Sequence, residues 1–296
     1  MSPATFEPAE LIIAPPLALA WRLYRRHLPA LVAVTLVPAA LWLVTILCEW
    51  LLRSAYGALW METGGAAAFV HLGIAAARMV AAGFLLAAQA WLAGAALFEP
   101  RPSVAEAIGE GWRACIRCGL TVLPLWFLSV VYAFIVLLVG RTAWLVYAPA
   151  GEWAAWTAII LVGSVALPPL LAATARYLLC VPVVLFDALG PFQALSVAAI
   201  HLQWRTLREQ WPSYGSYALL VVATVLAPSW LLVSSMYAAL ASGDVTPGVI
   251  AAGQMTAVAS SLVLVPFGIA VCVTLYFRIR PDYWATSDRD EGEENG

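Results

Sequence analysis

The stretch AWRLYRRHLPALVAVTLVPAALWLVTILCEWLL, residues 20–52, decides the architecture of this chain. It begins with Trp21, Arg22 and two more arginines, and it continues as a nearly uncharged apolar segment over 28–52. A helix needs about 20 apolar residues to cross the hydrocarbon core of a bilayer. The stretch therefore predicts a basic helix that leads directly into a membrane span.

The same arrangement occurs three times along the sequence. The pairs Trp21-Arg22, Trp112-Arg113 and Trp204-Arg205 are spaced 91 and 92 residues apart, and each precedes a long apolar segment. Self-similarity at a fixed period is the signature of tandem structural repeats. We expect a single membrane domain over 1–296, with repeat units at 8–99, 103–187 and 191–280 and a polar, acidic cytoplasmic tail at 281–296.

Composition places the chain in a membrane. Hydrophobic residues make up 63% of its 296 residues and charged residues only 11%, whereas a soluble domain carries about 25% charged residues. The segments long enough to span a bilayer are 28–52, 65–97, 119–140, 153–185, 214–241 and 248–277. The prediction is an all-α, multi-pass membrane protein with six transmembrane helices, in which each repeat holds an interfacial amphipathic helix and a two-helix hairpin. Pro168-Pro169 and Pro182 predict a break in the fourth span.

Helical periodicity divides the basic helices into an apolar and a polar face. In the second unit the apolar set is Val104, Ile108, Trp112 and Cys115. In the first unit the apolar set is Leu17, Trp21, Tyr24 and Leu28, with Arg22, Arg25 and Arg26, and the two faces are less cleanly divided. Helices of this kind lie at the membrane surface. We therefore expect the following residues to be interfacial anchors: Trp21, Arg22, Trp112, Arg113, Trp204 and Arg205.

The distribution of arginine predicts the orientation. Two spans per unit return the chain to its starting side, where 11 arginines fall, against Arg53 and Arg141 on the other side. Basic residues gather on the cytoplasmic side of membrane proteins. The expected location is the bacterial inner membrane, with both termini in the cytoplasm.

Arg78 and Arg176 are the two basic residues inside predicted spans, where a charge is costly and usually faces protein or water. Together with Asp187, they are the candidate contacts of an anionic lipid or a polar cavity. The alternative is structural, because such an arginine can also extend to the interface or form an ion pair inside the protein.

The sequence carries little sign of catalysis or metal binding. Cys115 and Cys118 have C-x2-C spacing, but no second Cys or His pair lies nearby, and a structural zinc site takes four ligands. P-loop, GxGxxG and GxSxG patterns do not occur. The sequence therefore predicts no catalytic residue, no cofactor and no metal site.

Two stretches resemble a known family. RYLLCVPVVLFDALGPFQAL, residues 176–195, and TLYFRIRPDYW, residues 274–284, are similar to bacterial and archaeal multi-span proteins related to the membrane domain of glycerophosphoryl diester phosphodiesterases. The likeness is carried by Pro182, the turn at Asp187, Gly190 and Pro191, the following Ala194-Leu195, and the ending from Tyr276 to Arg280. The chain departs from the family pattern at Asp187, where Glu is expected. Because catalysis in that family resides in a separate soluble domain, the resemblance implies a membrane module without hydrolase activity of its own.

The sequence supports three hypotheses about function, and we favour the first. It is a noncatalytic scaffold or accessory subunit of a membrane complex, with membrane lipids and other membrane or cytoplasmic subunits as partners. The second is a lipid or small-solute transporter with a cavity near Arg78 and Arg176, because parallel repeats and broken helices occur in transporters. The third, an intramembrane enzyme, requires clustered acidic, His or Ser side chains that the sequence does not indicate. No nucleic-acid partner is expected.

Overall fold

The computed structural model describes residues 15–56, 65–147, 179–201 and 247–279, together with a few single residues between 149 and 177. The regular structure of these residues is entirely helical, so the expected all-α fold is confirmed for them. The helices are α2 (Pro16–Tyr56), α4 (Gly65–Phe98), α5 (Val104–Tyr147), α7 (Cys180–Phe186), α8 (Pro191–His201) and α11 (Pro247–Ile279).

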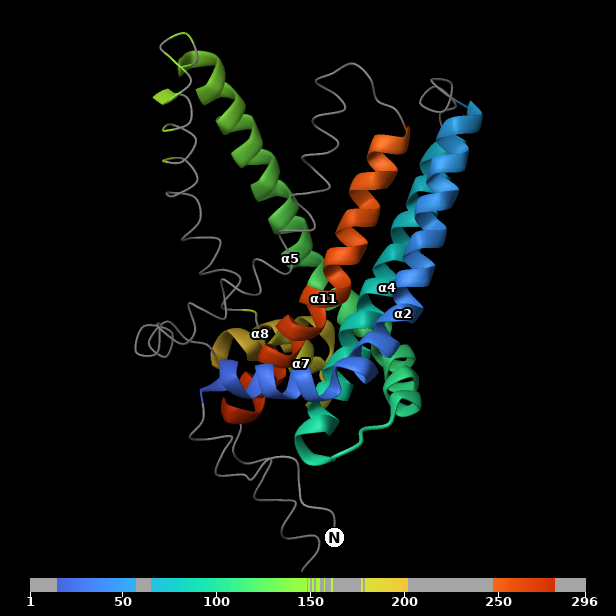
Figure 1. Cartoon of the computed structure of the whole chain (residues 1–296), viewed down its shortest axis with the longest axis vertical. Helices are drawn as coiled ribbons and strands as arrows, with labels where there is room; N and C mark the ends of the chain where they lie inside the picture. Colours follow the sequence, from blue (N-terminus) through green and yellow to red (C-terminus); the bar gives the residue numbers. More distant parts are fainter. Residues whose placement is uncertain are drawn as a thin grey trace, which may run out of the picture.

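The helices form two tiers (Figure 1). The start of α2, the short helices α7 and α8, and the end of α11 lie across the bottom of the molecule, and we call these residues, 16–28, 180–201 and 267–279, the base. The long helices rise from this base, so that α2 and α11 each change direction along their length (Figure 1).

Prolines account for these bends. Pro29 and Pro38 lie inside α2, and Pro266 lies inside α11. An internal proline lacks the amide hydrogen and clashes with the carbonyl four residues earlier, which kinks a helix. The first two predicted basic helices are each continuous with the span that follows them, since α2 covers the basic helix and the first span of the first unit and α5 does the same in the second. The third basic helix, around Trp204-Arg205, lies outside the described residues.

Two described helices are long and apolar enough to cross a membrane, Leu17–Leu52 within α2 and Leu72–Phe98 within α4. A third candidate arises if α7 and α8, which meet at 119°, form one broken span. These helices associate the chain with a membrane.

Of the other predicted spans, some lie within described helices and some lie outside the described residues. Segments 119–140 and 248–277 lie inside α5 and α11. Segment 214–241, most of 153–185 and Pro168-Pro169 lie outside the described residues. Pro182 lies in the first turn of α7, where a missing amide hydrogen costs little. The sharp turn comes later, between α7 and α8, where Ala188 has a positive φ of 51°.

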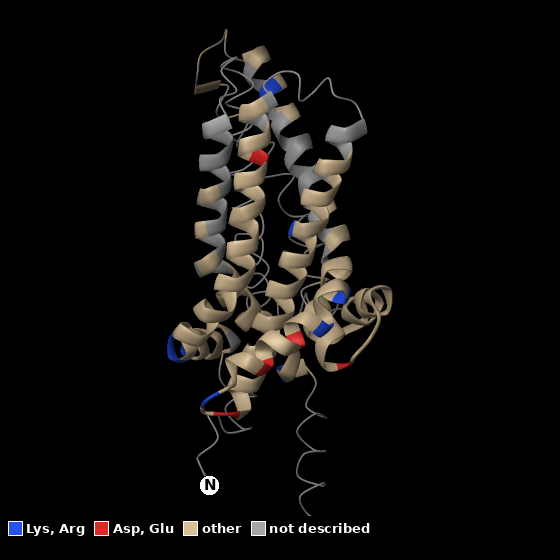
Figure 2. Cartoon of the chain, turned by 90° about the vertical axis from the view of Figure 1, so that its right-hand side faces the viewer, with Lys and Arg blue, Asp and Glu red and all other residues tan. Residues whose placement is uncertain are grey.

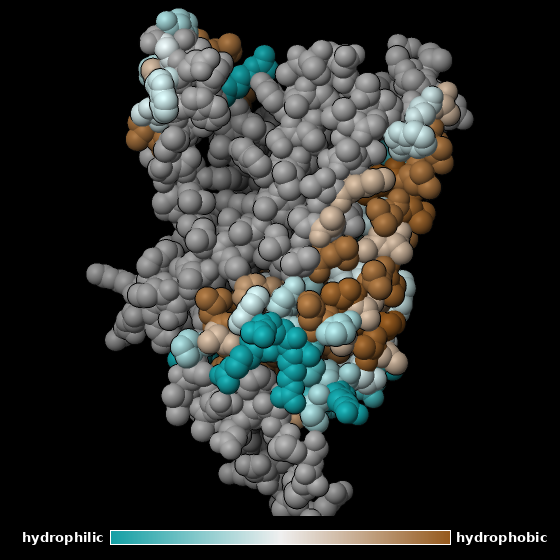
Figure 3. Space-filling view, in the orientation of Figure 1, coloured by the Kyte–Doolittle hydropathy of each residue, from teal (hydrophilic) through white to brown (hydrophobic). Residues whose placement is uncertain are grey.

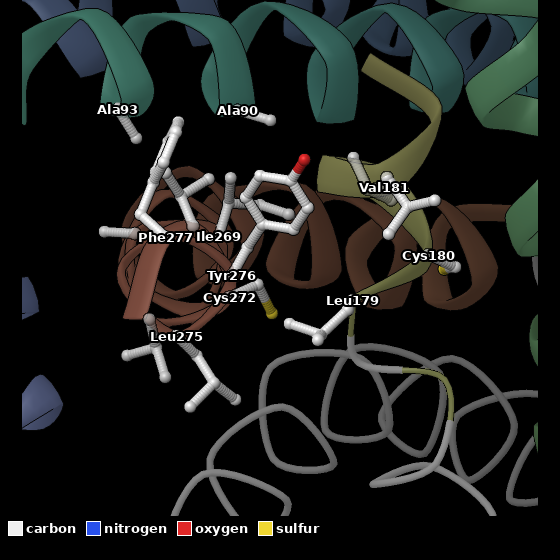
Figure 4. Close-up of a cluster of buried hydrophobic side chains, with 14 of the residues drawn as sticks. Ala90, Ala93, Leu179, Cys180, Val181, Ile269, Cys272, Leu275, Tyr276 and Phe277 are labelled. Carbon is white, nitrogen blue, oxygen red and sulfur yellow. The ribbon is translucent and has the colours of Figure 1, made fainter. Parts of the chain in front are cut away.

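The largest core cluster lies where the base meets the lower end of α4. In Figure 4, Tyr276 and Phe277 of α11 lie near Ala93 of α4 and Val181 of α7. Tyr276 and Leu179 are fully buried. The base is thus a packed layer that joins the ends of the long helices.

The rising part of α2 exposes large apolar side chains, namely Leu36, Leu43, Val44, Leu47 and Leu51. In Figure 3 a hydrophobic band covers this side of the molecule, above a hydrophilic region at the base. Charged residues also gather near the base, with few of them higher up (Figure 2). An apolar surface of this extent is stable against lipid rather than water.

α4 and α5 cross in unusually close contact. A Cβ atom added to Gly83 would lie 2.0 Å from the carbonyl oxygen of Cys115 and 2.8 Å from the amide nitrogen of Gly119. Gly111 of α5 lies against Phe84 and Ala88 of α4 in the same way. Small residues at such crossings let helix backbones approach where lipid gives no hydrophobic driving force.

Candidate functional site

The first segment of α2 has three distinct faces. Its buried face consists of Leu19, Ala20, Leu23, Tyr24 and His27. Its opposite face carries the exposed Arg22, Arg25 and Arg26, whose spacing puts them on one side of a helix. Between the two faces lies an exposed apolar strip of Leu17, Trp21 and Leu28.

This arrangement corrects the predicted apolar face of the first unit. Tyr24 turns into the core at 8% exposure, whereas Leu17, Trp21 and Leu28 remain 38–48% exposed. Amphipathic periodicity separates polar from apolar positions, but it does not distinguish protein from lipid as the apolar neighbour. The base supplies that distinction, because α4 and α11 cover only one part of the helix.

The exposed Trp21 is held in a defined position. Its ring stacks on Tyr24 with centroids 5.8 Å apart, and it meets Phe267 of α11 edge-on at 5.6 Å. Aromatic pairs in such geometries add to the stability of a contact. These contacts hold the Trp21 ring, and with it the neighbouring arginines of α2, in a defined position relative to α11.

The second Trp-Arg pair has similar surroundings. Trp112 is 54% exposed and its ring lies 5.1 Å from that of Phe84. Arg113 is exposed and pairs with Glu110 one turn earlier. The predicted apolar partner Cys115 is buried. The third pair, Trp204-Arg205, lies outside the described residues.

Arg78 of α4 forms an ion pair inside the hairpin. Its Nη2 donates to Oε2 of Glu49 in α2 at 2.8 Å, and its Nε donates to Oγ1 of Thr45 at 3.0 Å. The side chains of Arg78 and Glu49 are 22% and 11% exposed. Arg78 therefore has an ion-pair partner of the kind that the structural alternative expects, and Arg176 lies outside the described residues.

Sequence reasoning missed the role of Glu49, although a signal was present. Glu49 is the one acidic residue in 28–52, and Arg78 is the one arginine in 65–97. Single opposite charges in consecutive spans are expected to meet, because each needs a partner in a medium of low dielectric constant.

A second polar contact ties α4 to α2 near the bend. The fully buried Gln89 donates from Nε2 to the carbonyl oxygen of Leu31 at 2.7 Å, and also to Oγ1 of Thr35. Thr35 in turn donates to the same carbonyl. The nitrogen of the Gln89 amide therefore has two acceptors, as a buried donor needs, whereas its Oε1 has no hydrogen-bond partner among the described residues.

Asp187 lies at the turn between α7 and α8, and its partner comes from the far end of the chain. The hydroxyl of the fully buried Tyr276 donates to Oδ1 of Asp187 at 2.7 Å. Phe186 stacks on Tyr276 at 5.5 Å, and it fills the space opposite Gly94, where a Cβ would lie 2.5 Å from the ring. The contact joins the two stretches that carry the family resemblance.

The described cysteines divide by exposure. Cys48 is exposed on α2, whereas Cys115, Cys118, Cys180 and Cys272 are buried. Burial raises the pKa of the Cys118 thiol to about 12. The thiolate is the nucleophile and the metal ligand, so Cys118 is poorly suited to both roles at neutral pH.

No family model matches the chain, and no characterised protein or solved structure has significant similarity to it.

Proposed function

We propose that the chain is a noncatalytic scaffold or accessory subunit of a bacterial inner-membrane complex. It has six spans in three parallel units, each led by an interfacial Trp-Arg helix, and both termini are cytoplasmic. Its relation to the membrane domain of glycerophosphoryl diester phosphodiesterases is part of this proposal.

One observation carries the choice of a scaffold: three polar contacts in the described core join different helices. Arg78 bonds to Glu49 and Thr45, Gln89 bonds to the backbone of α2, and Tyr276 bonds to Asp187. A transport site at Arg78 would have to replace its ion pair with substrate. A framework that holds its helices by buried polar contacts suits a structural subunit better.

The resemblance also gains support from the contact between Asp187 and Tyr276. The two matching stretches are far apart in sequence, yet they meet through this hydrogen bond and through the stacking of Phe186 on Tyr276. Residues that form one packing unit are expected to recur together in a family.

The test is purification from mild detergent followed by native mass spectrometry and reconstitution into liposomes. We expect a second protein to co-purify in defined stoichiometry. The isolated chain should neither hydrolyse phosphodiesters nor move lipids or small solutes between compartments. Turnover or transport by the chain alone would contradict the proposal. Fusions of reporter proteins to both termini test the orientation separately.

A further inference from the structure

We propose that the first segment of α2 binds an anionic phospholipid of the cytoplasmic leaflet. The phosphate lies on the stripe of Arg22, Arg25 and Arg26, and the acyl chains follow the exposed apolar residues of the same helix. The inference deepens the proposed function and rests on it, since it requires that the chain be inserted in a membrane.

The charge of this segment fits a phosphate. Three guanidinium groups share one exposed face within two helical turns, and α2 contains no acidic residue before Glu49. Guanidinium groups bind phosphate oxygens through paired hydrogen bonds. Each basic side chain beside a membrane span is also attracted to an anionic leaflet, which raises the affinity by about fivefold per residue.

The apolar surroundings point to a lipid rather than a free phosphate. Leu17, Trp21 and Leu28 form an exposed strip directly beside the arginines. Above it, the rising part of α2 exposes Leu36, Leu43 and Leu47. Figure 3 shows the hydrophilic region at the base directly below the hydrophobic band. A ligand that matches both surfaces carries a negative head group and a long apolar chain.

The contacts within the protein preform this surface, so that its shape does not depend on a bound lipid. The proline-containing bend turns the segment across the base. Tyr24 and Phe267 hold the ring of Trp21 in place. A preformed surface loses less conformational entropy on binding than a flexible one.

The proposal is tested with the full-length chain in mild detergent, titrated with phosphatidylglycerol and, separately, with phosphatidylcholine. Binding is followed by native mass spectrometry. The double variant Arg25→Gln/Arg26→Gln should bind phosphatidylglycerol about 30-fold more weakly, because each juxtamembrane arginine contributes about 1 kcal/mol. Phosphatidylcholine binding should be weak and unchanged.

The matched control is Arg101→Gln/Arg117→Gln, which removes the same charge from an exposed and a half-buried arginine outside α2. It should change the affinity for phosphatidylglycerol by less than about threefold, since the site lies elsewhere and long-range attraction is screened. Equal losses in the two double variants would overturn the proposal in favour of nonspecific attraction.

Soluble glycerol phosphate separates a lipid site from a phosphate site. It should not displace phosphatidylglycerol at equal concentration, because it lacks the acyl chains. Displacement would overturn the proposal. Neither result bears on the co-purification of a partner or on turnover by the isolated chain, so failure of the lipid site is distinguishable from failure of the scaffold.

Discussion

α2 and α4 are consecutive helices that pack against each other, yet their surroundings differ. In the most apolar 18-residue window of each helix, 33% of the residues are buried in α2 and 72% in α4, although the window of α2 has the higher mean hydropathy, 2.5 against 1.7. In a membrane, lipid is as apolar as leucine, so hydropathy does not identify the helix at the centre. The Ala and Gly content of α4 identifies it as the central helix, because small residues let α2, α5 and α11 approach closely.

The largest effect is expected from removing one charge of the pair that joins the two helices. Glu49→Leu leaves Arg78 without its carboxylate inside the hairpin, and loss of one partner of a buried pair costs about 3–5 kcal/mol. We expect a corresponding fall in the free energy of unfolding, measured by denaturation in detergent. The double variant Glu49→Leu/Arg78→Leu should recover most of the loss. Unchanged stability of Glu49→Leu would mean that the pair does not hold the hairpin.

Gly83→Ala tests the close contact between α4 and α5. Its Cβ would lie 2.0 Å from the Cys115 carbonyl oxygen, so α4 and α5 must separate, at a cost of about 3 kcal/mol. Gly73→Ala in the same helix is the matched control, because no atom lies within 4 Å of its added Cβ. It should be neutral or stabilising by up to about 1 kcal/mol through helix propensity. Equal melting temperatures for the two variants would refute the close crossing.

Tyr276→Phe removes the hydrogen bond to Asp187 and keeps the buried ring. The expected loss of stability is about 1–3 kcal/mol, since the half-buried Asp187 carboxylate loses the hydrogen bond from the tyrosine hydroxyl. Asp187→Asn retains an acceptor for the tyrosine hydroxyl and should cost less. If Tyr276→Phe unfolds at the same denaturant concentration as the parent chain, the contact contributes nothing to the base.

The smallest perturbation is chemical labelling at the seam between α4 and α5. The folded pKa of Cys118, about 12, lies above its ordinary value of 9.0. Folding therefore favours the protonated thiol, and this stabilisation is present below pH 9 and is lost as the pH rises from 9 to about 12. At pH 8.5, iodoacetamide should modify Cys118 at least about 100-fold more slowly in the folded chain than in dodecyl sulfate. Peptide mass spectrometry measures both rates, and equal rates would place Cys118 outside the core.

Sequence reasoning reached the helical class and the membrane association, because both follow from local composition and segment length. It did not show that Tyr24 is buried while Trp21 is exposed, because that difference depends on where α11 packs against α2 after the bend. The pairing of Glu49 with Arg78 could have been predicted, because each is the only charged residue of its span. The contact between Asp187 and Tyr276 could not, because residues 89 apart meet only through the packing of α7 against α11.

The most direct test of the account uses the unmodified protein in lipid nanodiscs that contain a phospholipid with a photoreactive diazirine in its acyl chain. After irradiation, mass spectrometry locates the crosslinked peptides. We predict that crosslinks fall on the outer face of α2, at Leu36, Leu43, Leu47 and their exposed neighbours, and are sparse in 81–97 of α4. Crosslinks of equal density in 81–97, or none on α2, would contradict the claim that α2 faces lipid while α4 forms the centre of the fold.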